Sequence, residues 1–366
     1  MQNNSYFDII DEIDNTSSIK TMKILVTGAA GFIGSKLAYE LAKRGDEVIG
    51  VDNINDYYDV RLKYARLQEI LGIAYDGTDM PFSKEYTSTR HPNLRFIRLA
   101  IEDKDSLDAL FGKEHFDIVV NLAAQAGVRY SITHPYTYMQ SNLVGFLNIL
   151  EACRNYNVPK LVFASSSSVY GMNEKVPYNE EDKVDVPVSL YAATKKSNEL
   201  MAHSYSKLYG IQCIGLRFFT VYGPWGRPDM SPMLFANALR DGKAIKVFNN
   251  GDMIRDFTYI DDIVEGTMHT IDKDIPADKR ENGVAYRIYN IGCSHPVKLM
   301  DFISELEQAY GEEAKKEFLP MQPGDVYQTN ADTSRLEAEM GYKPHVSLHG
   351  GIGEFMKWYK SEKNPI

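Results

Sequence analysis

The sequence predicts an α/β protein with a doubly wound parallel sheet and a smaller C-terminal lobe. Short apolar segments alternate with helical segments as far as residue 219, which is typical of a parallel sheet with helices on both faces. A glycine-rich turn directly follows the first apolar segment. After residue 220 this alternation stops and Gly and Pro become frequent. A chain of 366 residues is long enough for two lobes of this kind.

Composition and charge exclude several classes of protein. The net charge is −10 and no basic stretch suits nucleic acid, so we expect no nucleic-acid partner. No apolar run reaches the length of a membrane span. Residues 1–21 are acidic and polar and lack the features of a signal peptide, so we expect a poorly ordered extension. Cys153, Cys213 and Cys293 lie far apart, which indicates reduced, buried thiols in a cytoplasmic protein.

The first elements surround the glycine turn. Residues 23–27 (KILVT) predict a buried strand, residues 32–44 a helix ended by Gly45, and residues 47–52 a second strand. Between the first strand and the helix lies GAAGFIG, whose glycines at 28, 31 and 34 are spaced three apart. In this context the motif is the Rossmann-type dinucleotide fingerprint, in which glycines let the pyrophosphate approach the backbone at a helix N-terminus.

Asp52, at the end of the second strand, favours NAD as the dinucleotide. It lies at the interval where an acid binds the adenosine ribose hydroxyls, and its carboxylate would repel the 2′-phosphate of NADP.

The remaining elements continue the same pattern. We expect strands at 94–101, 116–124, 160–166 and 211–219, and helices near 60–71, 104–112, 135–155 and from Leu190 to Tyr209, with a long loop at 72–92. Ligands of such a sheet bind beyond the carboxyl ends of its strands, where Gly28, Asp52, Ala123, Ser166 and Thr220 fall.

The C-terminal part is expected to hold the substrate. Residues 221–232 should form a loop, and we expect helices at 232–241, 299–310 and 347–360, a strand at 243–248, a helix at the end of 251–266 and a turn at 322–326. The predicted division is 22–219 with a return segment at about 256–292 for the dinucleotide-binding domain, and 220–255 with 293–366 for the substrate lobe.

Tyr191 and Lys195 are the first catalytic candidates. Four residues apart, they share one face of a helix that Ser189 caps and Gly210 ends. A phenol titrates near pH 10, and an ammonium one turn away would lower that pKa so that the tyrosine can act as a base. A hydroxyl of the serine run at 165–168 would hold the reacting alcohol. YxxxK alone is a weak motif, and an ordinary amphipathic helix is the alternative interpretation.

Four passages together identify a resemblance: NLAAQAGVRYS, SSSSVYG, RFFTVYGPWGRPDM and GDMIRDFTYIDDIV. With them the chain resembles the extended short-chain dehydrogenases/reductases over nearly all of residues 22–360, and within these the nucleotide-sugar epimerases and dehydratases. It is most similar to the UDP-glucuronate 4-epimerases. The resemblance implies a sheet of about seven strands, a smaller C-terminal lobe, bound NAD, a UDP-sugar substrate and a homodimer.

The resemblance also assigns residues. Tyr191 matches the family's base, Lys195 its lysine, which also holds the nicotinamide ribose, and Ser166 its catalytic Ser/Thr; Asn121 and Asn142 match asparagines near the cofactor. The implied cofactor-binding residues are Gly28, Ala30, Gly31, Phe32, Ile33, Gly34, Asp52, Asn53, Ile101, Leu122, Ala123, Ala124, Gln125, Ser165, Tyr191, Lys195 and Phe218. Ala100 departs from the family, which often has an acid there for the adenine amine. Another group or water must replace it, and Asp103 is a nearby candidate.

Ser167 and Ser168 bear on the reaction. Relatives that dehydrate their sugar usually carry Asp-Glu at these positions, and relatives that decarboxylate a uronic acid usually keep the glutamate. Two hydroxyls provide no acid or base for dehydration, and they suit a substrate that is itself a carboxylate. The alternative is that these serines only cap the strand end.

Further substrate contacts follow from family position and charge. Arg255 is the expected pyrophosphate anchor, with a salt bridge to Asp256 or Asp252 as its alternative. The other implied contacts are Asp325 to the uridine ribose, Val247 and Phe248 to uracil, and Thr220 and Arg227 to the sugar carboxylate. Arg227 alternatively braces its loop, and Arg129 is either a ligand contact or a buried structural arginine.

These assignments predict an enzyme, a UDP-glucuronate 4-epimerase. The resemblance implies that Tyr191 takes the proton of the 4-hydroxyl while C4 gives hydride to NAD, and that the 4-keto sugar turns over before hydride returns. The alternatives are a 4-epimerase of a neutral UDP-sugar and a non-catalytic NAD-binding sensor, although sensors tend to lose the tyrosine or lysine. We expect no metal, because the eight histidines show neither HExxH nor pairing with cysteines.

Overall fold

A computed structural model describes residues 21–322 and 325–366 of the chain. The predicted extension therefore lies outside the described residues except for residue 21, and so does the centre of the predicted turn at 322–326. The core is one eight-stranded sheet in the order β12-β7-β6-β5-β1-β2-β4-β3. Its strands are β1 (Lys23–Thr27), β2 (Glu47–Asp52), β3 (Glu85–Thr87), β4 (Leu94–Arg98), β5 (Ile118–Asn121), β6 (Lys160–Ser166), β7 (Gln212–Phe218) and β12 (Tyr286–Ile291).

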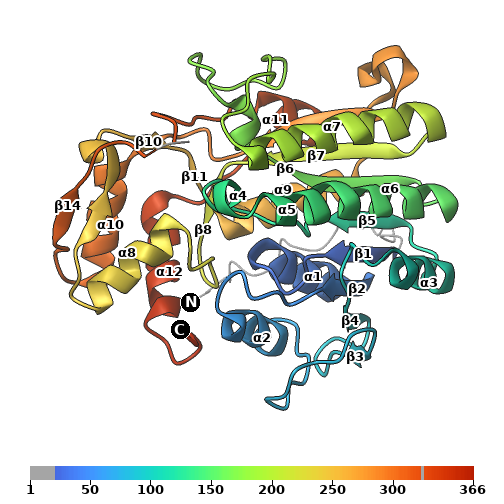
Figure 1. Ribbon diagram of the computed structural model, residues 1–366, viewed down its shortest axis with the longest axis horizontal. Coiled ribbons are helices and arrows are strands. Elements are labelled where there is room, and N and C mark those ends of the chain that lie inside the picture. Colours follow the sequence, from blue (N-terminus) through green and yellow to red (C-terminus); the bar gives the residue numbers. More distant parts are fainter. Residues whose placement is uncertain (1–20, 323–324) are drawn as a thin grey trace, which may run out of the picture.

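The doubly wound α/β fold class is confirmed, because helices cover both faces of this sheet (Figure 1). Side chains alternate along a strand, so Ile24 and Val26 of β1 belong to one hydrophobic core and Leu25 to the other. The helices α1 (Phe32–Arg44) and α9 (Ile260–Asp272) contribute to the first core, and α3 (Lys104–Glu114), α6 (Phe146–Asn155) and α7 (Leu190–Tyr209) to the second.

The sheet has one strand more than expected. β3 lies in the predicted loop at 72–92 and pairs antiparallel with β4, with Tyr86 opposite Phe96. It is three residues long and largely exposed, so it lacks the apolar run that marks the seven parallel strands. The preceding helix α2 (Val60–Glu69) ends two residues earlier than predicted.

The predicted helix at 135–155 is interrupted. It consists of α5 (Pro135–Tyr138), a π-helical segment η1 (Met139–Gly145) and α6, and a short helix that was not predicted, α4 (Tyr130–Thr133), precedes it. At the end of η1 a Cβ on Gly145 would lie 2.7 Å from Cγ1 of Ile101, so only glycine lets this helix approach the loop after β4 so closely. The π-helical segment therefore lies against the carboxyl edge of the sheet.

By contrast, α7 begins and ends where the sequence predicts. The hydroxyl of Ser189 accepts a hydrogen bond from the backbone N–H of Ala192 at 3.1 Å, and Gly210 closes the helix in the left-handed conformation with φ 72°. These caps fix the rotation of α7, and with it the direction of Tyr191 and Lys195.

The C-terminal lobe lies to the left of the sheet in Figure 1 and is built from short pieces. Three two-stranded sheets pair β8 with β11, β9 with β14 and β10 with β13. Its elements are β8 (Thr220–Tyr222), α8 (Ser231–Arg240), β9 (Ile245–Val247), β10 (Ile254–Arg255), β11 (Phe257–Tyr259), β13 (Val297–Lys298), α10 (Leu299–Tyr310), β14 (Lys316–Phe318) and α12 (Leu348–Tyr359), whereas α11 (Ser334–Met340) packs against β12 of the large sheet. Short 3-10 turns are η2 (Ser167–Tyr170), η3 (Phe248–Gly251), η4 (Ala277–Lys279) and η5 (Glu281–Gly283).

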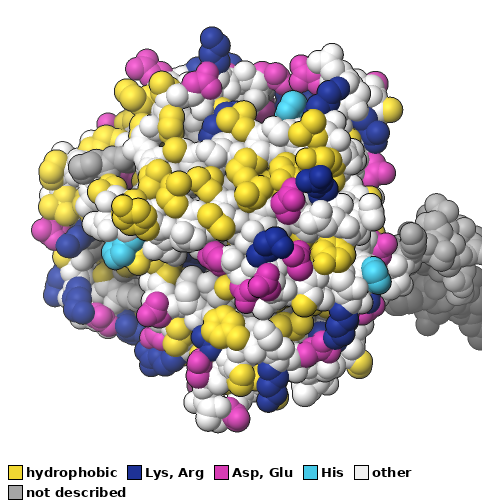
Figure 2. Space-filling view, turned by 45° about the vertical axis from the view of Figure 1, so that its right-hand side comes forward, with side chains coloured by type: hydrophobic (Ala, Val, Ile, Leu, Met, Phe, Trp, Pro, Cys, Tyr) yellow, Lys and Arg dark blue, Asp and Glu magenta, His cyan; other side chains and the backbone are white. Residues whose placement is uncertain are grey.

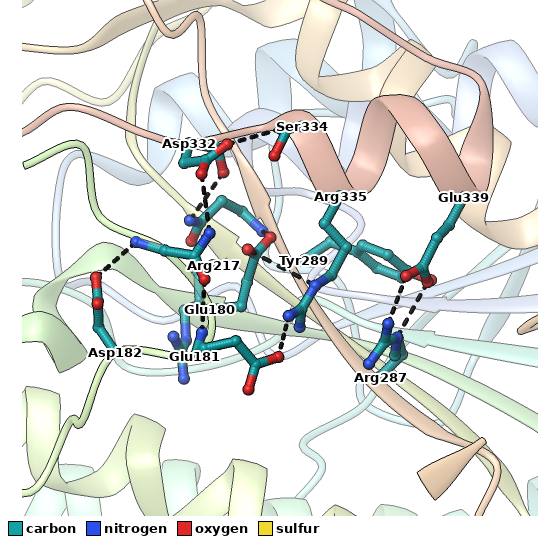
Figure 3. A network of polar contacts seen from close by, with 12 residues as sticks. Glu180, Glu181, Asp182, Arg217, Arg287, Tyr289, Asp332, Ser334, Arg335 and Glu339 are labelled. Atoms are coloured by element: carbon teal, nitrogen blue, oxygen red, sulfur yellow. Dashed lines mark hydrogen bonds and ion pairs between the residues drawn. The ribbon is translucent and has the colours of Figure 1, made fainter. Parts of the chain in front are cut away.

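A network of ion pairs connects α11 to the edge of the large sheet (Figure 3). Glu339 of α11 accepts hydrogen bonds from Nε of Arg287 at 3.0 Å and from the hydroxyl of Tyr289 at 2.7 Å, both on β12. Arg335 of α11 pairs with Glu181 and lies 3.9 Å from Glu180. These contacts hold α11 beside the sheet.

Two further expectations concern cysteines and membranes. Cys153 and Cys213 are buried and Cys293 is half-buried, and all three are free thiols. None of the helices within 21–322 and 325–366 is long and apolar enough to cross a membrane.

Candidate active site

A cavity of about 1110 Å³ lies between the carboxyl edge of the sheet and the C-terminal lobe. All five of the strand-end residues named above line it: Gly28, Asp52, Ala123, Ser166 and Thr220. Of the other predicted residues, Gly31, Phe32, Ile33, Gly34, Asn53, Ile101, Leu122, Ala124, Gln125, Ser165, Ser167, Ser168, Tyr191, Lys195, Phe218, Arg129, Arg227, Phe248, Arg255 and Asp325 also line it. The structure therefore brings nearly the whole predicted set together.

Of the residues assigned to the site, Ala30, Asn121, Asn142, Val247 and the adenine candidate Asp103 are not on the cavity wall. Ala30 is fully buried, and its N–H donates to Asp52 at 3.2 Å, so it supports the turn from behind. Val247 is also fully buried, whereas Lys246 and Phe248 on either side line the cavity. Side chains alternate along β9, so one residue of the predicted Val-Phe pair must face the core.

The glycine turn sets the cofactor end of the cavity. Gly28 has φ +74°, and a Cβ there would lie 2.9 Å from the backbone nitrogen of Ala123; a Cβ on Gly34 would lie 2.1 Å from the carbonyl oxygen of Gly28. The first turn of α1 can therefore pack directly against the turn. Gly31 caps α1 without a side chain, so the free N–H groups of this first turn face the cavity and suit a pyrophosphate.

Asp52 is fixed at the next strand end. Its two oxygens accept backbone N–H groups, from Ala30 at 3.2 Å and from Ile54 at 2.7 Å, and Nζ of Lys63 lies 3.8 Å away. The carboxylate is therefore oriented before any ligand binds, as a ribose-binding acid requires.

Arg66 of α2 is completely buried behind this turn. Its guanidinium donates to the carbonyl oxygen of Ala30 at 3.1 Å and to that of Trp225 at 2.7 Å. It therefore connects the glycine turn to the loop between β8 and α8, which carries Arg227. This contact could not be predicted from the sequence, because the partners are backbone atoms of two distant segments.

Tyr191, Lys195 and Ser166 all line the cavity, and Nζ of Lys195 lies 6.0 Å from the centre of the Tyr191 ring. Burial raises the pKa of Tyr191, and the nearby Ser166 hydroxyl and the charge of Arg227 oppose this rise. Nζ of Lys195 donates to the carbonyl oxygen of Ala164 at 2.7 Å, and burial lowers the pKa of Lys195 to about 8. In this arrangement, Ser166 and Arg227 favour the phenolate.

The serine run at 165–168 both caps the end of β6 and presents hydroxyls to the cavity. The hydroxyl of Ser166 caps η2 by accepting from the N–H of Ser168 at 3.2 Å, and the hydroxyl of Ser168 donates to it at 2.9 Å. Ser166, Ser167 and Ser168 nevertheless all line the cavity. Ser165 donates to Glu199, which pairs with the buried Arg217, so its hydroxyl serves the core.

Arg227 lies on the cavity wall and is paired. Its Nε is 3.0 Å from Oδ1 of Asp229, and the hydroxyl of Tyr57 donates to Oδ2 of the same carboxylate at 3.0 Å. Burial alone would raise the pKa of Asp229, but Arg227 and Tyr57 hold it below its ordinary value. Asp229 and Tyr57 were not predicted; the position of Asp229 two residues after Arg227 was the only signal in the sequence.

Arg255 has no acidic partner in the described part of the chain. It donates to the carbonyl oxygens of Val326 at 2.7 Å and of Ile254 and Tyr327 at 2.9 Å, and burial lowers its pKa. The alternative of a salt bridge to Asp256 is wrong, because that carboxylate accepts backbone N–H groups. The alternative with Asp252 is likewise not formed. Arg255 therefore lines the cavity without an ion pair among the described residues, and the charge of nearby Asp325 opposes the lowering of its pKa.

Arg129 and Asp325 meet across the cavity mouth. Nη2 of Arg129 is 3.1 Å from Oδ2 of Asp325, and its guanidinium lies 5.2 Å from the ring centre of Phe248. The side chain of Arg129 is 53% exposed, so its interpretation as a buried structural arginine is wrong.

Comparison with known proteins agrees with this geometry. The sequence pattern of the NAD dependent epimerase/dehydratase family matches residues 24–292. Protein CapI of Staphylococcus aureus is 49% identical over 92% of this chain and 98% of its own, and UDP-glucuronate 4-epimerase 4 of Arabidopsis thaliana is 45% identical over 94% and 77%. The crystal structure of UDP-glucuronic acid 4-epimerase from Bacillus cereus with UDP-glucuronic acid and NAD matches with a TM-score of 0.79, at 35% identity over 93% of this chain and 99% of that one.

NAD is the cofactor that this cavity takes. The first turn of α1 provides N–H donors for its pyrophosphate, and Asp52 provides an oriented carboxylate for a ribose. Lys195 and Tyr191 lie further along the same cavity.

Proposed function

The chain belongs to the NAD dependent epimerase/dehydratase family and is an NAD-dependent nucleotide-sugar epimerase, and on this premise we propose that it interconverts UDP-glucuronate and UDP-galacturonate at C4. The observation that carries the proposal is the position of Arg227. Its guanidinium lines the same cavity as Tyr191, and its charge opposes the rise that burial causes in the pKa of that phenol. A sugar whose C4 hydroxyl meets Tyr191 would bring its C6 carboxylate near this cation.

The serines support the same substrate. Ser167 and Ser168 present hydroxyls beside Ser166, so this wall adds no carboxylate that would repel a uronic acid. It also lacks the acid and base that elimination of water would require.

NAD supplies the acceptor and donor of the hydride at C4. Tyr191 removes the proton of the 4-hydroxyl and returns it after the 4-keto sugar has turned over, with Ser166 holding the oxygen. Arg255, with no acidic partner in the described residues, holds the pyrophosphate of the sugar nucleotide during that turn, and Thr220 and Arg227 hold the carboxylate. Phe248 and Asp325 lie at the nucleoside end.

One observation favours a neutral UDP-sugar as a second candidate. Arg227 is already paired with Asp229, so its charge is largely neutralised before a substrate arrives. The sugar carboxylate would have to share this guanidinium. Tyr191 and Lys195 both reach the cavity, which argues against the sensor alternative.

A panel of UDP-sugars tests the proposal. The purified protein should convert UDP-glucuronate to UDP-galacturonate without added NAD, because the reaction has no net redox change. UDP-glucose and UDP-galactose should react at least tenfold less efficiently. Preferential turnover of the neutral pair would overturn the proposal in favour of the second candidate.

We further propose a homodimer. Apolar side chains gather in a band across the face shown in Figure 2. The exposed members on α4 to α7 are Ile132, Tyr136, Met139, Val144, Leu147, Leu200, Leu208 and Tyr209. Tyr136 is 84% exposed, which is costly for a surface that meets only water. We also propose the predicted division of the chain, in which residues 22–219 and about 256–292 bind the dinucleotide and residues 220–255 and 293–366 bind the substrate.

We further propose a cytoplasmic location, with which the three free thiols are consistent.

A further inference from the structure

Tyr57 lines the active-site cavity and takes no part in the proposed transfers of proton and hydride. It lies in the loop between β2 and α2, shortly after Asp52, and its hydroxyl donates to Oδ2 of Asp229 at 3.0 Å. Asp229 belongs to the loop between β8 and α8 of the C-terminal lobe. The bond therefore joins the dinucleotide-binding part of the chain to the loop that carries Arg227.

The loop that carries Tyr57 is held by side chains of its own. Oδ1 of Asn53 accepts the backbone N–H of Asn55 at 3.0 Å, and Oδ1 of Asn55 accepts that of Tyr57 at 3.4 Å. Nζ of Lys63 donates to the same oxygen of Asn55 at 2.8 Å. The backbone of Tyr57 therefore has a set position on the cavity wall.

The ring of Tyr57 is also fixed. It packs edge-on against the ring of Tyr130, with the ring centres 4.8 Å apart. A Cβ on Gly127, whose φ is +102°, would collide with the Tyr57 hydroxyl, so only glycine leaves room for it there. These contacts direct the hydroxyl at Asp229.

Asp229 in turn orients Arg227. Its two oxygens accept from Nε and Nη2 of the guanidinium, with 3.0 Å between Nε and Oδ1. Within residues 21–322 and 325–366 the third nitrogen, Nη1, has no hydrogen-bond partner, and it is not buried. The side chain of Arg227 keeps 22% exposure on the cavity wall. Nη1 is therefore the part of the guanidinium that a ligand in the cavity can reach.

The hydroxyl of Tyr57 has two effects on a carboxylate that approaches Nη1. Asp229 repels such a ligand, and a hydroxyl that donates to Asp229 stabilises its charge and weakens its field on a second anion. The bond also keeps Asp229 directed at Nε and Nη2 of Arg227. Both effects favour a ligand with a carboxylate, and neither concerns a neutral sugar.

We propose that Tyr57 is a positioning residue for the sugar carboxylate and that it contributes to the preference for a charged over a neutral sugar. It acts through Asp229, which it holds on Nε and Nη2 of Arg227, so that Nη1 remains free for the C6 carboxylate. The inference rests on the proposed turnover of UDP-glucuronate. It assigns Tyr57 no contact with the substrate or with NAD.

Steady-state kinetics of Tyr57→Phe with UDP-glucuronate and UDP-glucose test the proposal on the full chain with its bound nucleotide. The substitution removes one hydroxyl and keeps the ring against Tyr130. KM for UDP-glucuronate should rise about fivefold, the scale of one lost hydrogen bond, and KM for UDP-glucose should change less than about twofold. The value of kcat should change little for either sugar, because Asp229 still binds Arg227 at two points.

A double-mutant cycle shows whether the effect passes through Asp229. In the Asp229→Asn background the negative charge is already gone, so adding Tyr57→Phe should raise KM for UDP-glucuronate less than about twofold. A general loosening of the loop would raise it equally in both backgrounds. Tyr58→Phe is the matched control, because the hydroxyl of Tyr58 accepts from Arg66 and has no bond to Asp229. It should leave the ratio between the two sugars unchanged.

Failure of this inference is distinguishable from failure of the proposed function. A parent protein that prefers UDP-glucose overturns both, and this result requires no variant. With a parent that prefers UDP-glucuronate, an unchanged sugar preference in Tyr57→Phe overturns the positioning role alone. Equal effects of Tyr57→Phe in the parent and in Asp229→Asn overturn it as well.

Discussion

Arg227 and Asp229 form a two-point ion pair on the wall of the active site, with Nε of the arginine 3.0 Å from Oδ1 of the aspartate. The pair determines how the enzyme meets a charged sugar. The guanidinium is oriented in advance, but a substrate carboxylate must approach it beside an existing negative charge.

Arg227→Ala should impair UDP-glucuronate far more than UDP-glucose. The lost charge-assisted pair corresponds to about 1.5–3 kcal/mol, or about 10- to 150-fold in kcat/KM, and UDP-glucose has no carboxylate to lose. A 4-keto acid that is no longer held should also lose carbon dioxide, so UDP-pentose should accumulate. Arg129→Ala is the control and should affect both sugars alike. Equal losses for both sugars in Arg227→Ala would mean that Arg227 only braces its loop.

Asp229→Asn should lower KM for UDP-glucuronate about fivefold while leaving KM for UDP-glucose unchanged. The substitution removes the competing negative charge, which we estimate at about 1 kcal/mol, and retains an acceptor for Tyr57. Its kcat should fall, because Arg227 is held less firmly. Steady-state kinetics with both sugars provide the measurement, and a weaker affinity for UDP-glucuronate would contradict the argument.

Tyr191→Phe should reduce turnover at least ~100-fold and leave NAD binding intact, because it removes only the hydroxyl that moves the proton. Tyr138→Phe is the matched control. Its ring centre lies 6.1 Å from that of Tyr191, and its hydroxyl donates to the carbonyl oxygen of Ala126 at 2.9 Å. That variant should lose stability rather than turnover. Near-normal activity of Tyr191→Phe would remove it from the mechanism.

Glu114→Gln should destabilise the fold at neutral pH and not in strong acid. Arg95 above all, with Lys23 and Lys113, lowers the pKa of Glu114 from 4.5 to about 2. Because the pKa of this carboxyl is lower in the folded than in the unfolded chain, its charge stabilises the fold at any pH above the unfolded pKa. This stability is lost as the pH falls from about 4.5 toward 2. The free energy of unfolding at pH 7 should drop by at most about 3 kcal/mol, less where solvent screens the pairs.

Urea titrations of both proteins at pH 7 and pH 3 provide the measurement. The difference in the free energy of unfolding between Glu114→Gln and the parent should be clearly smaller at pH 3. Glu85, which contacts the same Arg95 but is more exposed, should show a smaller gap at pH 7 when changed to Gln. A gap that does not change with pH would mean that packing, rather than charge, accounts for Glu114.

Local signals in the sequence were sufficient for the fold and for much of the site. The caps at Ser189 and Gly210 and the glycine spacing each lie within one segment, so they could be recognised without a structure. The π-helical segment Met139–Gly145 could not, because the close approach of Gly145 to Ile101 that accompanies it joins residues that are distant in the chain.

The same distinction applies to the site residues that were missed. Glu102 and Asp229 are ordinary acids in the sequence, and only the folded chain places both on the cavity wall and gives Asp229 an arginine partner. The pKa of Tyr191 is a further property that the sequence alone could not predict. Its spacing to Lys195 was correct, but the direction of the lysine and the extent of burial depend on tertiary packing.

Arg66 has a consequence for the order of events in turnover. Its guanidinium is bonded at once to the turn that faces the dinucleotide and to the loop that precedes Arg227. A displacement of that loop therefore strains the dinucleotide turn, and an occupied turn resists the displacement. We therefore expect binding at the two ends to be coupled, and by reciprocity each ligand should raise the affinity for the other by the same factor.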